Sequence, residues 1–149
     1  MNKSTLLLVE DNPQDELLIL RALHKANVAN QIDVVRDGQQ ALDYLFGVGE
    51  FSHRSDAALP VVALLDINLP RVGGLEVLAR LRDDPRTRLL PVVILTSSDE
   101  DRDRLRSYEH GANSFVRKPV DFHAFAECVS RLGIYWVAVN QPPRNGGAA

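Results

Sequence analysis

The sequence lacks the features that mark several common classes of protein. It contains one cysteine, Cys128, so an internal disulfide is impossible and a reducing compartment is expected. The first apolar run, residues 6–9, is too short for a signal peptide, and no run approaches the roughly 20 residues that cross a bilayer. The net charge of −3 gives no reason to expect nucleic acid or an anionic membrane as a partner. We therefore predict a cytoplasmic protein with no nucleic-acid or membrane partner.

What the sequence does contain is an alternation of strand-like and helix-like segments. The 149 residues, 45% of them hydrophobic, suffice for one domain with one core. We expect strands at residues 5–9, 31–35, 61–65, 90–95 and 113–116. We expect a first helix that begins at Pro13 and has Leu17, Leu20, Leu23 and Ala26 on its apolar face. Further helices are expected at 37–46, 74–82 and 99–110, and a last one from a cap at Asp121 to about residue 137. This order is typical of an α/β fold, a doubly wound parallel sheet with helices on both faces.

Two segments are expected to lie outside regular elements. Residues 47–59 have no clear hydrophobic period and are expected to form a long loop. Residues 140–149 are rich in proline and glycine and are expected to be a disordered tail. The predicted domain therefore spans residues 1–139.

Polar residues follow the expected strands at their carboxyl ends. Asp66 follows the apolar run of the third strand, and taken alone it is well explained as a cap of the next turn. However, Glu10 and Asp11 follow the first strand, Thr96 the fourth and Lys118 the fifth. Because the carboxyl ends of parallel strands share one edge of the sheet, these side chains are expected to converge there.

The converging groups suit phosphoryl transfer. Three carboxylates at close range repel each other, and a hard divalent cation such as Mg²⁺ relieves that repulsion. Asp66 could then act as a nucleophile that forms an acyl phosphate. Thr96 could donate its hydroxyl, and Lys118 its charge, to the oxygens of the arriving phosphoryl group.

At this point the sequence resembles the receiver domains of two-component response regulators, over residues 4–132. The resemblance rests on Glu10-Asp11, Asp66 with Asn68-Leu69-Pro70, Thr96-Ser97, and Phe115 with Lys118-Pro119, in this order at the strand ends. It implies a flavodoxin-like (βα)5 fold. It also implies roles for particular residues: Asp66 as phosphoacceptor, Glu10, Asp11, Asp66 and the carbonyl of Asn68 as Mg²⁺ ligands, Thr96 and Lys118 as phosphoryl contacts, Phe115 as the aromatic that moves inward with Thr96, and a cis bond before Pro119.

A narrower resemblance concerns the loop at 47–59 and the closing residues 134–139. Both are similar to the single-domain regulators that work with bacterial phytochromes, which carry no output domain. The resemblance implies a self-catalysed phosphoacceptor and not an enzyme. It further implies that the protein takes its phosphoryl group from a sensor histidine kinase, for which a bacterial phytochrome is the candidate, and that it signals through protein–protein contacts.

Two other function classes use similar elements. A phosphatase of the haloacid dehalogenase type also has an Asp nucleophile after a buried strand, but it needs a second Asp two residues on, where this chain has Asn68. A flavin-binding module of flavodoxin type needs a Ser/Thr/Gly-rich phosphate loop after the first strand. This chain has Glu10-Asp11-Asn12-Pro13 there, which would repel phosphate.

The end of the last helix is apolar almost all round. Ile134, Tyr135, Trp136, Val137 and Val139 extend beyond the stripe that one domain can bury. A large exposed aromatic patch is rare on monomers, so we predict a homodimer with Tyr135, Trp136 and Val139 in its interface. The alternative is that this end folds back onto its own domain.

Overall fold

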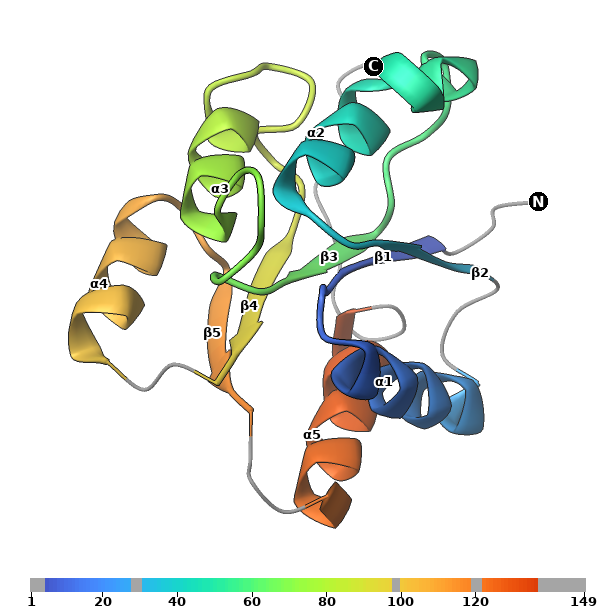
Figure 1. Cartoon of the computed structure of the whole chain (residues 1–149), viewed down its shortest axis with the longest axis vertical. Coiled ribbons are helices and arrows are strands. Elements are labelled where there is room, and N and C mark those ends of the chain that lie inside the picture. Colours follow the sequence, from blue (N-terminus) through green and yellow to red (C-terminus); the bar gives the residue numbers. More distant parts are fainter. Residues whose placement is uncertain (1–4, 28–30, 98–99, 119–121, 137–149) are drawn as a thin grey trace.

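The computed structural model describes residues 5–27, 31–97, 100–118 and 122–136, and it confirms the predicted α/β architecture (Figure 1). The five strands form one sheet in the order β2-β1-β3-β4-β5, and every neighbouring pair is parallel. Their bounds are β1 Thr5–Val9, β2 Gln31–Val35, β3 Val62–Leu65, β4 Val92–Thr96 and β5 Ser114–Arg117. From β1 the chain adds β2 on one side of the sheet and then β3, β4 and β5 on the other, so the direction of strand addition reverses between β1 and β3. In open α/β sheets, ligands bind at such a switch point.

The helices cover both faces of the sheet. They are α1 Pro13–Ala26, α2 Gly38–Phe46, α3 Gly74–Arg82, α4 Asp101–Glu109 and α5 Phe122–Ile134. In Figure 1, α1 and α5 lie on one face and α2 and α3 on the other, while α4 lies beside β5. None of the described helices is both long and apolar enough to cross a bilayer.

Alternation along the central strands divides the core into two layers. Successive side chains of a strand point to opposite faces. Accordingly, Leu7 and Val9 of β1 join the core under α2 and α3, whereas Leu6 and Leu8 join the core under α1 and α5. All four are at most 1% exposed, as expected for a strand that is buried on both faces.

The predicted loop at 47–59 was wrong in part, because it contains a 3₁₀ helix, η1 Gly49–Arg54. Gly47 ends α2 in the left-handed conformation (φ 66°), which turns the chain back on itself. The ring of Phe51 then packs edge-on against Tyr44 of α2, with centroids 5.5 Å apart. This tertiary contact, and not a local hydrophobic period, holds the segment in place.

The predicted buried face of α1 was also wrong in part. Leu17 is 51% exposed, whereas Ile19, Ala22 and Leu23 are buried. The helix is therefore turned so that Leu17 points away from the core.

The loop between β3 and α3 is fixed by two close approaches of glycine. A Cβ atom on Gly74 would lie 2.1 Å from the carbonyl oxygen of Asp66, and one on Gly38 would lie 1.8 Å from that of Val72. Only glycine fits at such distances. The loop that begins at Asp66 is thus held between the first turns of α2 and α3.

Arg82 ties the end of α3 to the two strands that follow it. Its guanidinium donates hydrogen bonds to the carbonyl oxygens of Leu90 (2.7 Å) and Gly111 (2.8 Å) and to the Oδ1 of Asn113 (3.0 Å). Burial lowers the pKa of Arg82, although the group remains charged. This hub positions the entries of β4 and β5.

Several predicted features lie outside the described residues. They are the Asp121 cap, the peptide bond before Pro119, Val137, Val139 and the tail at 140–149.

Candidate functional site

Three carboxylates lie close together at the edge of the sheet formed by the carboxyl ends of the strands, as the sequence predicted. Glu10 and Asp11 follow β1, Asp66 follows β3, and one oxygen from each lies within 4.8 Å of the others. Glu10 is 1% exposed and Asp66 is 7% exposed, whereas Asp11 faces solvent. Hard oxygen ligands in this arrangement, open on the Asp11 side, suit a divalent cation that keeps some of its water.

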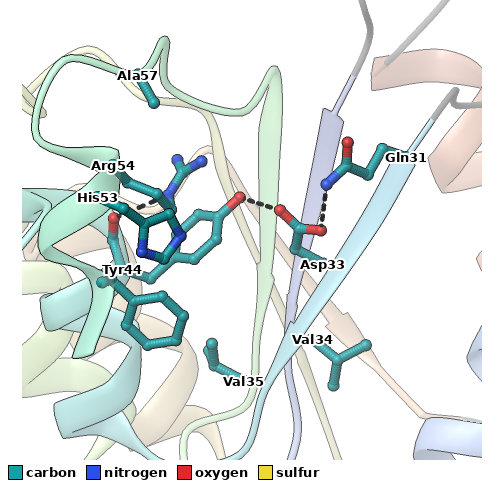
Figure 2. A pocket seen from close by; sticks show the side chains of 9 residues that line it. Gln31, Asp33, Val34, Val35, Tyr44, His53, Arg54 and Ala57 are labelled. Carbon is teal, nitrogen blue, oxygen red and sulfur yellow. Dashed lines mark hydrogen bonds between the residues drawn. The ribbon is translucent and has the colours of Figure 1, made fainter.

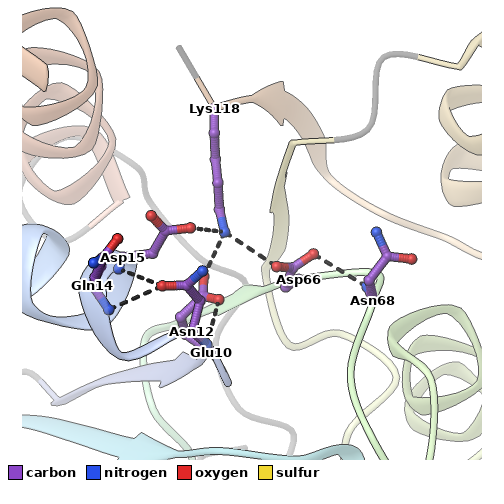
Figure 3. A network of polar contacts seen from close by, with 7 residues as sticks. All are labelled: Glu10, Asn12, Gln14, Asp15, Asp66, Asn68 and Lys118. Carbon is purple, nitrogen blue, oxygen red and sulfur yellow. Dashed lines mark hydrogen bonds and ion pairs between the residues drawn. The ribbon is translucent and has the colours of Figure 1, made fainter. Parts of the chain in front are cut away.

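Lys118 reaches into this cluster from the end of β5. Its Nζ lies 2.7 Å from Glu10 Oε1, 2.8 Å from Asp15 Oδ2 and 3.1 Å from Asp66 Oδ2 (Figure 3). Burial alone would lower the pKa of Lys118, but the hydrogen bonds to Asp15 and Glu10 outweigh it and raise the pKa above its ordinary value. The ammonium therefore stays charged beside Asp66.

Asp15 is the site residue that sequence reasoning missed. It lies in the first turn of α1, where the Asn12 side chain accepts hydrogen bonds from the backbone N–H groups of Gln14 (2.9 Å) and Asp15 (3.0 Å). Acidic residues are common in the first turn of a helix because they favour its dipole. The sequence therefore offered an ordinary reason for Asp15 and no signal of its contact with Lys118.

Glu10 is the least exposed carboxylate of the cluster. Its burial raises its pKa from 4.5 to about 7, and the nearby Lys118 only partly opposes this shift. Its other oxygen accepts the backbone N–H of Asn12 at 3.2 Å. A cation that binds beside Glu10 would favour the ionised form, so the residues present fit a divalent metal.

The remaining predicted residues surround Asp66. The backbone N–H of Asn68 donates to Asp66 Oδ1 at 3.2 Å, which orients the carboxylate. Thr96 is fully buried at the end of β4, and its carbonyl oxygen accepts the backbone N–H of Lys118 at 2.7 Å. Phe115 lies opposite Ile94 in the neighbouring strand and is half-buried. The ends of β4 and β5 are thus joined at the site.

The apolar end of α5 is divided between the core and the surface. Tyr135 is 48% exposed and Ile134 is 42% exposed, whereas Trp136 packs against the core under α1 and α5. The rings of Tyr135 and Trp136 meet edge-on, 5.1 Å apart, beside a hollow of about 370 Å³ that Cys128 and Leu132 also line. Trp136 therefore folds back onto its own domain, whereas the side chains of Ile134 and Tyr135 remain exposed.

A second hollow, of about 540 Å³, lies between the edge strand β2 and η1 (Figure 2). Four of its polar side chains, those of Gln31, Asp33, Tyr44 and Arg54, contact one another. Asp33 accepts hydrogen bonds from the Tyr44 hydroxyl and from Gln31, and the Arg54 guanidinium lies 3.7 Å from the centre of the Tyr44 ring. Burial raises the pKa of Tyr44, so its hydroxyl stays protonated. These contacts stabilise the attachment of η1.

Comparisons with known proteins agree with this geometry. Residues 6–130 match the model of the response regulator receiver domain. Response regulator Rcp1 of Synechocystis sp. is 32% identical over 89% of this chain and 88% of its own. Its Mn²⁺-bound crystal structure has a TM-score of 0.87 over 94% of this chain and 99% of that one. The phosphorylated cyanobacterial phytochrome response regulator RcpA is 34% identical, with a TM-score of 0.88 over 95% and 99% of the two chains. The bacteriophytochrome response regulator RtBRR is 47% identical, with a TM-score of 0.76 over 99% and 88%.

Proposed function

Because the chain belongs to the response regulator receiver family, we propose that it takes a phosphoryl group from a histidine kinase onto Asp66. The observation that carries this proposal is the position of Asp66. It is buried at the end of β3, and its Oδ2 lies 3.1 Å from the Lys118 ammonium and beside two further carboxylates. Membership of this family argues against the two alternative classes, a dehalogenase-type phosphatase and a flavin-binding module.

In the proposed reaction a carboxylate oxygen of Asp66 attacks the phosphorus atom. A new O–P bond forms, and the P–N bond to the histidine of the kinase breaks, so that the imidazole leaves with the bonding electrons. Lys118 places its charge at the incoming oxygens, and Thr96 offers a hydroxyl at the end of the neighbouring strand. Mg²⁺ on Glu10, Asp11, Asp66 and the Asn68 carbonyl would supply the remaining positive charge. The chain itself thus provides the catalytic groups.

The proposed switch involves β4 and β5. Movement of Thr96 toward the phosphoryl group would open space that the half-buried ring of Phe115 can fill. The guanidinium of Arg104 in α4 lies 5.8 Å from the centre of that ring. A shift of Phe115 would therefore change the position of Arg104 on the surface of α4, where a partner protein can bind.

We also propose a homodimer through the end of α5. Tyr135 and Ile134 are exposed side by side there, and a second copy of the chain would cover them. Aromatic residues are frequent anchors of such contacts. Trp136, which is only partly buried by its own domain, and Val139 remain predicted members of the interface.

We propose that the histidine kinase that donates the phosphoryl group is a bacterial phytochrome. Support comes from RcpA and RtBRR, which are phytochrome response regulators by name and match nearly the whole of this chain. A cytoplasmic location, where such a kinase would transfer its phosphoryl group, stays a prediction.

Phosphoryl transfer from an autophosphorylated histidine kinase tests the chemistry. The wild-type protein should acquire label in the presence of Mg²⁺, and Asp66→Asn should not. Asp83→Asn is the matched control, because it makes the same change at an exposed carboxylate at the end of α3. Circular dichroism establishes that both variants fold. Label in Asp66→Asn equal to that of the control would overturn the assignment of the phosphoacceptor.

A further inference from the structure

All three N–H groups of the Lys118 ammonium have a carboxylate partner. An ammonium has three donors and no acceptor. Glu10, Asp66 and Asp15 lie 2.7, 3.1 and 2.8 Å from Nζ. Glu10 and Asp66 come from strand ends, but Asp15 comes from α1, which packs on one face of the sheet (Figure 3).

A phosphoryl group on Asp66 would bring new oxygens to a lysine whose donors are already engaged. Lys118 can meet the first of these oxygens by giving up its contact with Asp66, whose carboxylate charge is lost in the new bond, but a second one requires that it release Glu10 or Asp15. The three carboxylates differ in access to water: the side chain of Glu10 is 1% exposed, that of Asp66 is 9% exposed and that of Asp15 is 27% exposed. A carboxylate that loses its ion pair is least costly where water can replace the ammonium. Asp15 is therefore the partner that Lys118 can release.

The position of Asp15 also favours its release. Its backbone N–H is bound by the Asn12 side chain at 3.0 Å, in the first turn of α1. The positive end of the helix dipole stabilises an anion there. The carboxylate thus remains compensated after Lys118 has turned away.

We propose that Asp15 is a positioning residue that competes with the phosphoryl group for Lys118. In the resting protein it holds the ammonium toward α1, and it thereby lowers the affinity of the site for a phosphoryl group. This inference rests on the proposed function, because it requires that Lys118 contacts the phosphoryl group.

The test uses beryllofluoride, which binds an aspartate carboxylate as a stable substitute for the phosphoryl group. Its affinity for the full chain with saturating Mg²⁺ is measured by calorimetric titration and by the ¹⁹F NMR signal of the bound form. We expect Asp15→Asn to bind beryllofluoride about 5- to 10-fold more tightly than wild type. Tenfold corresponds to about 1.4 kcal/mol, which is what one exchanged charged hydrogen bond can supply.

The matched control is Glu16→Gln. Glu16 is the next residue of the same helix turn, but its carboxylate pairs with Arg36 at 2.8 Å. This variant removes one negative charge near the site without touching Lys118, so its affinity should stay near that of wild type. Equal gains in Glu16→Gln and Asp15→Asn would show a general charge effect and would overturn the proposal.

A double-mutant cycle tests whether the effect passes through Lys118. In a Lys118→Met background, Asp15→Asn should give no further gain. If that background does not fold or does not bind beryllofluoride, Asp15→Glu gives a second test: it restores a carboxylate near Lys118 and should return the affinity to the wild-type value, and an affinity equal to that of Asp15→Asn would overturn the proposal. An affinity of Asp15→Asn equal to or below that of wild type would overturn the proposal. Failure of the wild-type protein itself to bind beryllofluoride would instead contradict the proposed function.

Discussion

Replacing Glu10 by Gln should change how the stability of the protein depends on pH. Glu10 is 1% exposed at the end of β1, and burial raises its pKa from 4.5 to about 7 even though Lys118 Nζ lies 2.7 Å away. Gln has nearly the same shape as a protonated Glu, and its single side-chain oxygen can still accept from Lys118 or from the backbone N–H of Asn12. Glu10→Gln therefore mimics the protonated state at every pH.

The direction follows from which state holds the proton more tightly. The folded protein binds a proton at Glu10 with a pKa of about 7, whereas the unfolded chain binds it with a pKa of 4.5. Between these values the folded state is the more protonated, so the free energy of unfolding falls as pH rises. The full effect of the difference between about 7 and 4.5 is about 3 kcal/mol, since one pKa unit is worth 1.36 kcal/mol. Most of it falls between pH 5 and pH 8.

Urea denaturation of both proteins, with chelator and at several pH values, measures this effect. The quantity of interest is the free energy of unfolding of wild type minus that of Glu10→Gln, because every other residue is the same in both proteins. We expect this difference to fall by about 3 kcal/mol as pH rises. Millimolar Mg²⁺ should recover part of the loss in wild type at pH 8, because it binds the ionised site. A difference that does not vary with pH would refute the reasoning from burial.

Three further predictions follow from the described contacts. Arg82→Lys should lower the free energy of unfolding by about 2 kcal/mol in urea denaturation, because a lysine cannot reproduce the forked set of hydrogen bonds; an unchanged midpoint would contradict the role of this hub. Thr96→Ala should still accept phosphoryl label, but NMR of labelled Phe115 should show a much smaller change on phosphorylation, and a change equal to that of wild type would exclude the coupling. Tyr135→Glu combined with Ile134→Glu, which leaves the packed Trp136 in place, should give a folded monomer in sedimentation, and a wild-type protein that is monomeric at tens of micromolar, phosphorylated or not, would rule out the dimer.

The sequence predicted the sheet and the strand-end carboxylates because both depend on local pattern. Uninterrupted apolar runs such as residues 62–65 have few alternatives to a buried strand, and parallel strands bring their carboxyl ends together whatever their order. Glu10, Asp11 and Asp66 could therefore be placed at one site before their distances were known.

What the sequence did not predict depends on contacts between distant residues. The ion pair of Asp15 joins residues 103 positions apart, and it requires the length of a lysine side chain that crosses from β5 to α1. Likewise, η1 depends on the packing of Phe51 against Tyr44, for which its own residues carry no period. The burial of Ile19 in place of Leu17 reflects the way α1 is rotated against the sheet and α5, since both residues are equally apolar.

The two close glycine contacts determine which way the site can deform. Gly74 brings the start of α3 against the carbonyl oxygen of Asp66, and Gly38 brings the start of α2 against the carbonyl oxygen of Val72. The loop that follows β3 is therefore closely packed on that side. A group added to Asp66 cannot be accommodated by displacing this loop without moving two helices. The side chains at the ends of β4 and β5, Thr96 and Lys118, need only rotate. We therefore expect this loop to stay in place when a group is added to Asp66, and the side chains at the ends of β4 and β5 to make the adjustment.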